Sequence, residues 1–322
     1  MSTALTIRLA AELPAISHAL DQAVDALPAS VQPVARHVLY AGGKRLRPFL
    51  TVLFARLWGY RENDIYLLAA AVEVLHVATL LHDDVLDDAI TRRGKPAAHM
   101  LFGVVPAILA GDALLAHANR LVAEYGDCRL NACLAEATVR TAAGEIQEIN
   151  YQRRVDQTTE IYSEIITDKT AWLIRASCEV GALRAGADQN GLDLAAQYGL
   201  QLGMAFQLVD DALDFAPPEE TGKPSCGDVR EGKLTPPLRL YREHLAPTER
   251  AAFDTDFCSG GLDDAAAQAI GARIRKLGFD AKGRQLADMH LEQARIALHA
   301  LPDNPERSIL EHIIAHVRNR EK

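Results

Sequence analysis

Residues 76–87 read HVATLLHDDVLD, and residues 204–214 read MAFQLVDDALD. In both stretches an apolar, helix-forming run leads into the pattern DDxxD. On a helix, positions four residues apart lie about 40° apart around the axis, so the outer aspartates of each pattern share a face. The sequence therefore predicts two helices that each end in a cluster of carboxylates: Asp83, Asp84 and Asp87 in the first, and Asp210, Asp211 and Asp214 in the second.

Carboxylates held this close repel one another, and the repulsion costs stability unless a hard divalent cation lies between them. Mg²⁺ binds through one or two carboxylates, keeps several waters and takes further ligands from substrate phosphates. The alternative is that acidic helix ends are simply solvated. The apolar flanks and the repetition of the pattern favour two Mg²⁺ sites and a diphosphate substrate.

Almost every other segment also has a helical pattern, because apolar residues recur three or four positions apart and the alternating Val/Ile/Thr runs of strands are missing. We expect an all-α fold in a single domain over residues 1–322, since no low-complexity linker divides the chain. The predicted helices cover residues 2–25, 31–41, 46–58, 63–88, 104–125, 130–152, 157–184, 189–216, 236–244, 247–255, 262–274, 277–300 and 304–319.

The bulk composition narrows the class of protein. The net charge of -9 argues against a nucleic-acid partner, and 49% hydrophobic residues can form a sizeable core. The five cysteines lack CxxC spacing, which predicts neither a disulfide framework nor a zinc site. No uncharged run is long enough for a transmembrane segment and no targeting peptide is evident, so we expect a cytoplasmic location.

Cations gather beside Gly and Pro in this acidic chain. The segment GGKRLRP at 42–48 has three cations in four residues, and RRGK at 92–95 follows the first acidic cluster. Lys223 and Lys233 follow the second cluster, and Lys169 interrupts an apolar helical stretch. Arginine can bind phosphate oxygens bidentately and lysine acts as a point charge, so together they predict room for two diphosphates.

These motifs resemble, in the same order, those of the all-trans polyprenyl diphosphate synthases. The resemblance spans nearly the whole chain and rests on GGKRLRP (42–48), EVLHVATLLHDDVLDDAITRRGKPA (73–97), GDALLA (111–116), DKTA (168–171), GMAFQLVDDALDF (203–215) and GKPSCGDVREGKLTPPL (222–238). It implies a helical bundle of the isoprenoid synthase type with a central cavity, and a homodimer. It also implies a prenyltransferase that ionises an allylic diphosphate, farnesyl or geranyl, condenses it with isopentenyl diphosphate and eliminates a proton.

The resemblance also implies residue roles. The Mg²⁺ ligands would be Asp83, Asp84, Asp87, Asp210 and Asp214, with Asp211 completing the catalytic aspartates. Isopentenyl diphosphate would be held by Lys44, Arg47, His76 and Arg93, and the allylic diphosphate by Arg92, Lys169, Lys223 and Lys233. Lys169 and Lys233 would also act in catalysis, with Thr170 and Gln207 supplying polar contacts.

Residues before the first cluster predict the product length. If the diphosphate is fixed at Asp83, the growing chain runs back along the helix and first meets Ala78 and Thr79, whose small side chains leave its path open. One helical turn rises about 5.4 Å, roughly the length of an isoprene unit. We expect an all-trans, membrane-soluble product of four or more units, centred on six to eight.

Two other functions are compatible with parts of the pattern. A class I terpene cyclase also uses DDxxD in an all-α bundle, but it would leave Lys44, Arg47 and Arg93 without a purpose. A non-catalytic subunit of a heteromeric prenyl synthase would be expected to lose an aspartate cluster or the lysines, and all of these positions are filled here.

Overall fold

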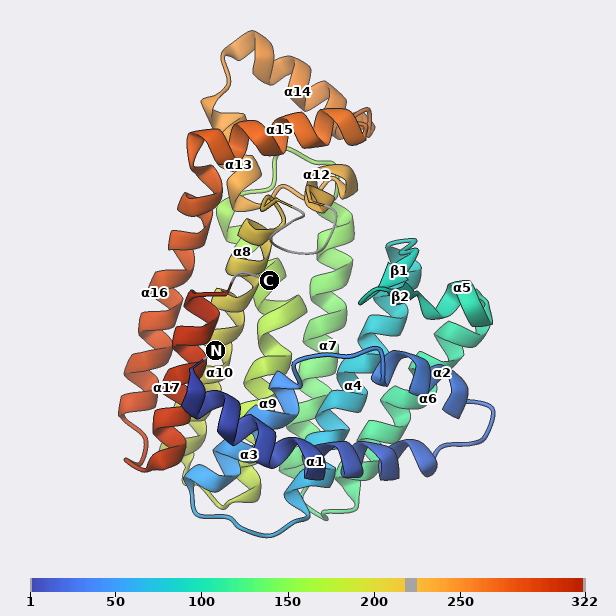
Figure 1. Cartoon of the computed structure of the whole chain (residues 1–322), viewed down its shortest axis with the longest axis vertical. Helices are drawn as coiled ribbons and strands as arrows, with labels where there is room; N and C mark the ends of the chain where they lie inside the picture. Colours follow the sequence, from blue (N-terminus) through green and yellow to red (C-terminus); the bar gives the residue numbers. More distant parts are fainter. Residues whose placement is uncertain (1, 218–224, 321–322) are drawn as a thin grey trace. The chain divides into compact units, whose positions relative to one another are not determined.

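The computed structural model describes residues 2–217 and 225–320 and is almost entirely helical (Figure 1). The prediction of an all-α fold is therefore confirmed. The chain forms two compact units, one of residues 1–139, 173–199 and 298–312 and the other of residues 140–172, 200–297 and 313–322. The prediction of a single domain with a central cavity stays a prediction.

The first unit contains the first acidic motif. Its complete elements are α1 (Thr3–Asp25), α2 (Gln32–Leu39), α3 (Leu46–Leu57), α4 (Ile65–Leu86), β1 (Thr91–Arg92), β2 (Lys95–Pro96), α5 (Ala98–Phe102) and α6 (Val104–Ala123). Helices α4 and α6 pack side by side and run antiparallel (Figure 1). His82 near the end of α4 contacts the carbonyl of Ile108, and Tyr125 after α6 donates to the carbonyl of Asp64 before α4.

Helix α4 is apolar on nearly every side, and α1, α3 and α6 all pack against it. Its length and composition would also suit a membrane span, but 67% of its most apolar window is buried inside the protein. It is therefore a core helix, and the first acidic motif lies at its end.

The second unit contains the second acidic motif, and four helices belong to both units. The shared helices are α7 (Cys128–Tyr151), α10 (Gln189–Leu213), α16 (Phe279–His299) and α17 (Pro305–Arg318), and α9 (Trp172–Arg184) lies in the first unit except for Trp172. The other elements of the second unit are α8 (Thr159–Ile166), the π-helix η1 (Thr167–Ala171), α12 (Gly227–Glu231), α13 (Pro236–His244), α14 (Pro247–Ser259) and α15 (Asp264–Leu277). A small core that includes Phe215, Phe253 and Phe257 joins the segments around α12 to α15.

Three local features differ from the sequence prediction. The pattern suggested no strands, whereas Thr91–Arg92 and Lys95–Pro96 pair as a short antiparallel hairpin. Its turn needs a left-handed backbone, which Arg93 and Gly94 adopt with φ of 52° and 75°. The predicted helix over 157–184 begins at Thr159 and contains the π-turn, and α5 and α12 were not predicted as helices.

Candidate active site

The basic cluster of the first unit begins at the turn before α3. Arg45 has a left-handed backbone, with φ of 49°, and its guanidinium donates to Glu73 Oε1 at 2.6 Å and to the carbonyl of Leu39. This buried ion pair anchors the turn to α4. The neighbours of Arg45 are thereby presented at a fixed place, with Lys44 exposed and Arg47 half-buried.

Arg93 closes the same turn from the hairpin side. Its guanidinium donates to the carbonyl of Gly42, and a Cβ at Gly43 would come within 2.7 Å of Arg93 Nη1. Glycine is therefore required at 43 both for this close approach and for its φ of 143°. The GGKRLRP segment and the hairpin thus bring together cations that are almost 50 residues apart in the sequence.

Arg47 and His76 lie within this concentration of positive charge. Burial and the neighbouring Arg93 lower the pKa of Arg47 to about 10, although Glu73 acts in the opposite direction. Burial, followed by the charges of Arg47 and Arg93, lowers the pKa of His76 well below 6.5, so its ring is neutral at pH 7. Arg47 Nε is buried and has no hydrogen-bond partner in the part of the chain that the structure describes. A neutral donor and several guanidiniums around an unsatisfied N–H suit an anion with several oxygens.

The three aspartates of the first motif have different surroundings. Asp84 is fully buried, and its Oδ1 accepts a hydrogen bond from Arg92 Nε at 2.7 Å. Arg92 Nη2 also forms an ion pair with this oxygen. Asp83 is half-buried and Asp87 is exposed. The outer pair is therefore the more accessible to a metal, and the ligand role of Asp84 stays a prediction.

The second motif is organised by a chain of hydrogen bonds in the second unit. Thr170 donates to Gln207 Oε1 at 2.9 Å, Gln207 donates to Asp211 Oδ1 at 2.6 Å, and Tyr162 donates to Asp211 Oδ2. Burial raises the pKa of Asp211 to about 7, even though the two hydrogen bonds act in the opposite direction. Asp211 thus fixes the end of α10 and is the least accessible member of the motif.

Asp214 and Asp228 complete the acidic surroundings. Asp214 accepts the backbone N–H groups of Gly227 and Asp228, each at 3.0 Å. Burial raises the pKa of both carboxyl groups, and for Asp228 the charges of Asp214 and Asp211 add to the rise. Asp228 and Tyr162 are not among the residues selected from the sequence, because no local pattern shows that they lie beside the second motif.

Two of the predicted cationic residues meet at one carboxylate of α7. Glu148 Oε1 lies 2.6 Å from Lys169 Nζ and 3.1 Å from Lys233 Nζ. Glu145 and Glu231 also contact Lys169 and Lys233, at 2.7 and 2.8 Å. Burial alone would lower the pKa of Lys169, but the glutamates outweigh it and raise that pKa, so the lysine remains charged. The sequence pattern alone does not show whether Glu145 and Glu148 line the site or face water.

Both acidic motifs have the chemistry that Mg²⁺ requires. They offer hard carboxylate oxygens, and within residues 2–217 and 225–320 the buried atoms Asp84 Oδ2 and Asp228 Oδ2 have no hydrogen-bond partner. Burial is the main cause of the raised pKa values near the second motif, and the charges of neighbouring carboxylates add to it, so a cation placed among these groups would be stabilised. Among the described residues no three His, Cys, Asp or Glu side chains converge as a ready-made cage. Mg²⁺ needs no such cage when waters and substrate phosphates complete its shell.

The structure places the predicted site residues that it describes in two sets, one in each unit, and their roles stay predictions. The first unit brings Arg47, His76, Arg92 and Arg93 close to the first motif, and the second brings Lys169, Thr170, Gln207 and Lys233 close to the second motif. Lys223 lies outside the described residues. Ala78 is fully buried, and Thr79 is half-buried with its hydroxyl donating to the carbonyl of His76 at 2.8 Å.

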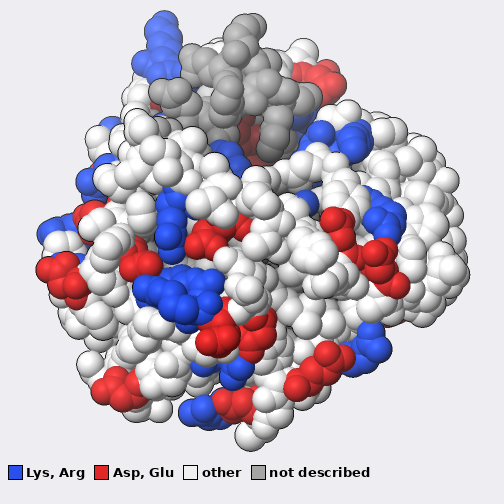
Figure 2. All heavy atoms as spheres, turned by 60° about the horizontal axis from the view of Figure 1, so that its bottom comes forward, with Lys and Arg blue, Asp and Glu red and all other residues white. Residues whose placement is uncertain are grey.

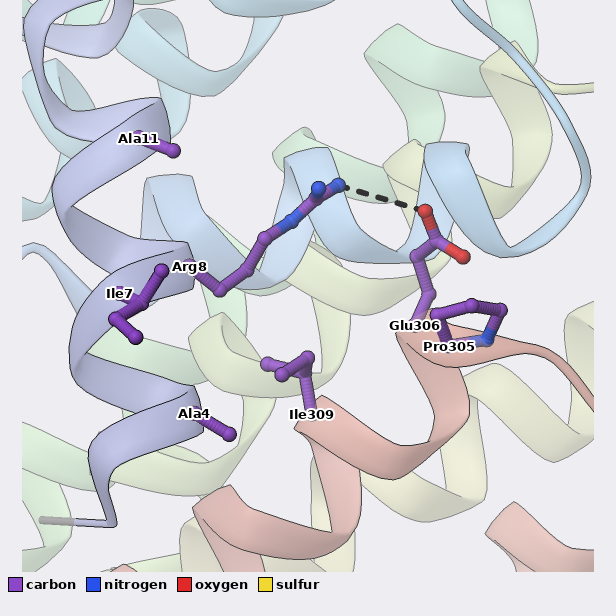
Figure 3. Close-up of a pocket in the computed structure, with 7 residues that line it drawn as sticks. All are labelled: Ala4, Ile7, Arg8, Ala11, Pro305, Glu306 and Ile309. Carbon is purple, nitrogen blue, oxygen red and sulfur yellow. Dashed lines mark hydrogen bonds and ion pairs between the residues drawn. The ribbon is translucent and has the colours of Figure 1, made fainter.

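A separate hollow in the first unit has a different character (Figure 3). It has a volume of about 360 Å³ and is lined by Ala4, Ile7, Arg8, Ala11, Pro305, Glu306 and Ile309. Arg8 is paired with Glu306 at 3.4 Å and with Glu12 at 3.1 Å. The paired charges and methyl groups of this hollow offer no concentration of cations or carboxylates, and we assign it no part in the active site.

Comparison of the chain with known proteins identifies relatives over almost its entire length. The family model described as polyprenyl synthetase matches residues 28–269. Heptaprenyl diphosphate synthase component 2 of Geobacillus stearothermophilus is 35% identical, over 97% of each chain. The short chain isoprenyl diphosphate synthase of Methanothermobacter thermautotrophicus is 33% identical, over 92% of each chain.

A solved structure is similar over almost the entire length. The polyprenyl synthase from Caulobacter crescentus CB15, complexed with calcium and isoprenyl diphosphate, superposes with a TM-score of 0.93. It is 36% identical, and the match covers 99% of this chain and 98% of the other.

Proposed function

The chain belongs to the polyprenyl synthetase family of prenyltransferases, and we propose that it extends an allylic prenyl diphosphate with isopentenyl diphosphate. The observation that carries the proposal is the pair of guanidiniums of Arg47 and Arg93 beside the neutral ring of His76. In a chain of net charge -9, this local concentration of positive charge suits a polyanion such as a diphosphate. A terpene cyclase would have no second diphosphate to place there.

We assign isopentenyl diphosphate to Lys44, Arg47, His76 and Arg93. The allylic diphosphate is assigned to Arg92, Lys169, Lys223 and Lys233. Bound Mg²⁺ would neutralise the charge that develops on the departing diphosphate. Asp83, Asp87, Asp210 and Asp214 are the ligands that we propose.

The hydrogen-bonded chain of the second unit suits the ionisation step. Thr170 and Gln207 present fixed dipoles that require no reorganisation while the allylic group carries positive charge. Lys169 and Lys233 are held between glutamates until an anion competes for them. As in the family, the released diphosphate would take the proton that the product loses.

Analysis of the products tests this function. The purified chain is given farnesyl diphosphate, labelled isopentenyl diphosphate and Mg²⁺, and the products are separated by length. We expect an all-trans product of four or more units, centred on six to eight. A product that stops at three units would contradict this length, and diphosphate release without isopentenyl diphosphate would support the cyclase instead. The relatives include heptaprenyl and short-chain enzymes, so similarity alone leaves the length open.

The variant Ala78→Phe tests the proposed path of the growing chain. We expect it to shorten the product by at least one unit, because a phenyl ring five residues before Asp83 would block the path. Ala69→Phe is the matched control. Ala69 is on the same helix and also fully buried, but nine residues away it faces the opposite side. The path is wrong if both variants make the same product as the parent chain.

An exposed apolar face supports the proposal of a homodimer. It consists of Met100, Leu101, Val104, Val105, Ile108 and Leu109, which are all at least 37% exposed. In Figure 2 the right side of the molecule, where α5 and α6 lie in Figure 1, bears few charges. Such a continuous patch is typical of an interface.

Sedimentation of the purified chain tests the homodimer. We expect a dimer for the parent chain and a monomer for Leu109→Glu, since the charge would be buried in the interface. Met289→Glu, at a residue that is 64% exposed on α16, should remain dimeric. A monomeric parent chain would favour a heteromeric enzyme, such as the name of the Geobacillus component suggests.

A further inference from the structure

Arg320, two residues beyond the end of α17, contacts the second acidic motif. Its Nη2 lies 2.8 Å from Asp210 Oδ1, and its guanidinium carbon lies 4.4 Å from the centre of the Phe206 ring. The Arg320 side chain is 12% exposed, whereas that of Asp210 is 45% exposed. The guanidinium is therefore packed on α10 by an ion pair and a cation–π contact rather than left in solvent.

The main chain around Arg320 is fixed from another helix. Arg284 of α16 donates to the carbonyl of Arg318 at 2.8 Å and also to the carbonyl of Arg320. Arg318 in turn pairs with Asp288 of α16 at 2.9 Å. These contacts hold the segment at α16 and direct the side chain of Arg320 toward Asp210.

A guanidinium and a metal ion cannot both neutralise Asp210 without cost. A divalent ion on this carboxylate would lie close to the guanidinium, and the two positive charges would repel each other. Mg²⁺ also demands a nearly regular shell of oxygens, and the guanidinium occupies one of the two oxygens that Asp210 can offer. The two cations therefore compete for one carboxylate.

We propose that Arg320 is a counterion that Mg²⁺ must displace from Asp210, so that metal binding releases the segment around residue 320. The proposal rests on the proposed function only in taking Asp210 as a metal ligand. Before substrate binds, the positive charge of Arg320 partly neutralises the second acidic motif and so lowers the affinity of that motif for metal. After displacement, the guanidinium is available to an anion on the metal.

Metal binding without any substrate tests the competition. Mn²⁺ serves as the probe, and its binding to the full chain is measured by electron paramagnetic resonance. We expect Arg320→Gln to bind Mn²⁺ about three- to tenfold more tightly than the parent chain, and Arg320→Lys to stay within about twofold of it. Arg318→Gln makes the same change of net charge on the same segment but pairs with Asp288, so its affinity should not change. Equal or weaker binding by Arg320→Gln would overturn the proposal.

Hydrogen exchange of the parent chain gives a second, independent measurement. The amides of Asn319 and Arg320 donate to the carbonyls of Ala315 and Val317, so they report on this segment. Their exchange should accelerate when Mn²⁺ is added, and unchanged exchange at saturating metal would also overturn the proposal. Neither measurement requires turnover. If no prenyl transfer is found but Arg320→Gln still binds Mn²⁺ more tightly than the parent chain, the proposed function is wrong. The proposed competition between Arg320 and the metal is then still supported.

Discussion

Asp83→Asn is expected to lower turnover by about 10³-fold or more and to leave the fold intact. The loss corresponds to about 4 kcal/mol of the activation barrier, which is the scale on which a metal ion stabilises developing charge. Asp83 is half-buried at the end of a core helix, and asparagine has nearly the same shape. Steady-state kinetics with both substrates and the melting temperature of each variant provide the measurement.

Asp88→Asn is the matched control for Asp83→Asn. Asp88 is exposed and lies five residues after Asp83, and its substitution by asparagine removes the same charge. Its φ of 47° is a left-handed conformation that asparagine accepts well. We expect this control to keep turnover within about twofold of the parent chain, since the change is a surface substitution. Comparable losses in both variants would show that general charge, and not metal ligation at Asp83, causes the effect.

Gly144→Ala is expected to destabilise the protein by about 1–3 kcal/mol and to reduce turnover by about 10²-fold. A Cβ at Gly144 would lie 2.8 Å from the Cα of Lys169 and 2.9 Å from the carbonyl carbon of Asp168. Because these atoms belong to the backbone of η1, relief requires that η1 move away from α7. The Lys169 ammonium would move with it. Chemical denaturation and single-turnover kinetics measure the two effects separately.

Gly181→Ala separates the effect on stability from the effect on the site. A Cβ there would lie 3.1 Å from Phe54 Cβ and from the carbonyl carbon of Thr51, which are core atoms of the first unit. We expect a similar loss of stability with turnover per folded molecule within about threefold of the parent chain. If Gly144→Ala is destabilised yet keeps full turnover, the position of Lys169 does not matter for catalysis.

The helices could be predicted because their signals are local. Apolar residues at three- and four-residue spacing indicated α4, α10 and α13, and α13 begins and ends where the pattern predicted. The hairpin at Thr91–Pro96 was missed because strands of two residues have no periodicity, and only the left-handed turn marks it. Burial of α4 on nearly every side also could not be read from composition alone.

The residues of the site could be predicted from the sequence, but the pairs that they form with one another could not. The acidic motifs and most of the cations were recognised from spacing and resemblance, whereas the pairing of Asp84 with Arg92 depends on how the hairpin folds back. Glu148 lies 21 residues before Lys169 and 85 before Lys233 in the sequence, and nothing local shows that both lysines meet there. Arg320 was not recognised, because its contacts with α10 join segments about 110 residues apart.

The wide π-turn of Thr167–Ala171 has a consequence for how this gene can change. In that turn Lys169 reaches Glu145 and Glu148 on α7, while the next residue, Thr170, reaches Gln207 on α10. A π-turn holds one residue more than the α-helical turn that would replace it. Loss of a single codon here would restore a regular helix and turn one of these two side chains away from its partner. We therefore expect the length of this segment to matter as much for the site as the identity of its lysine.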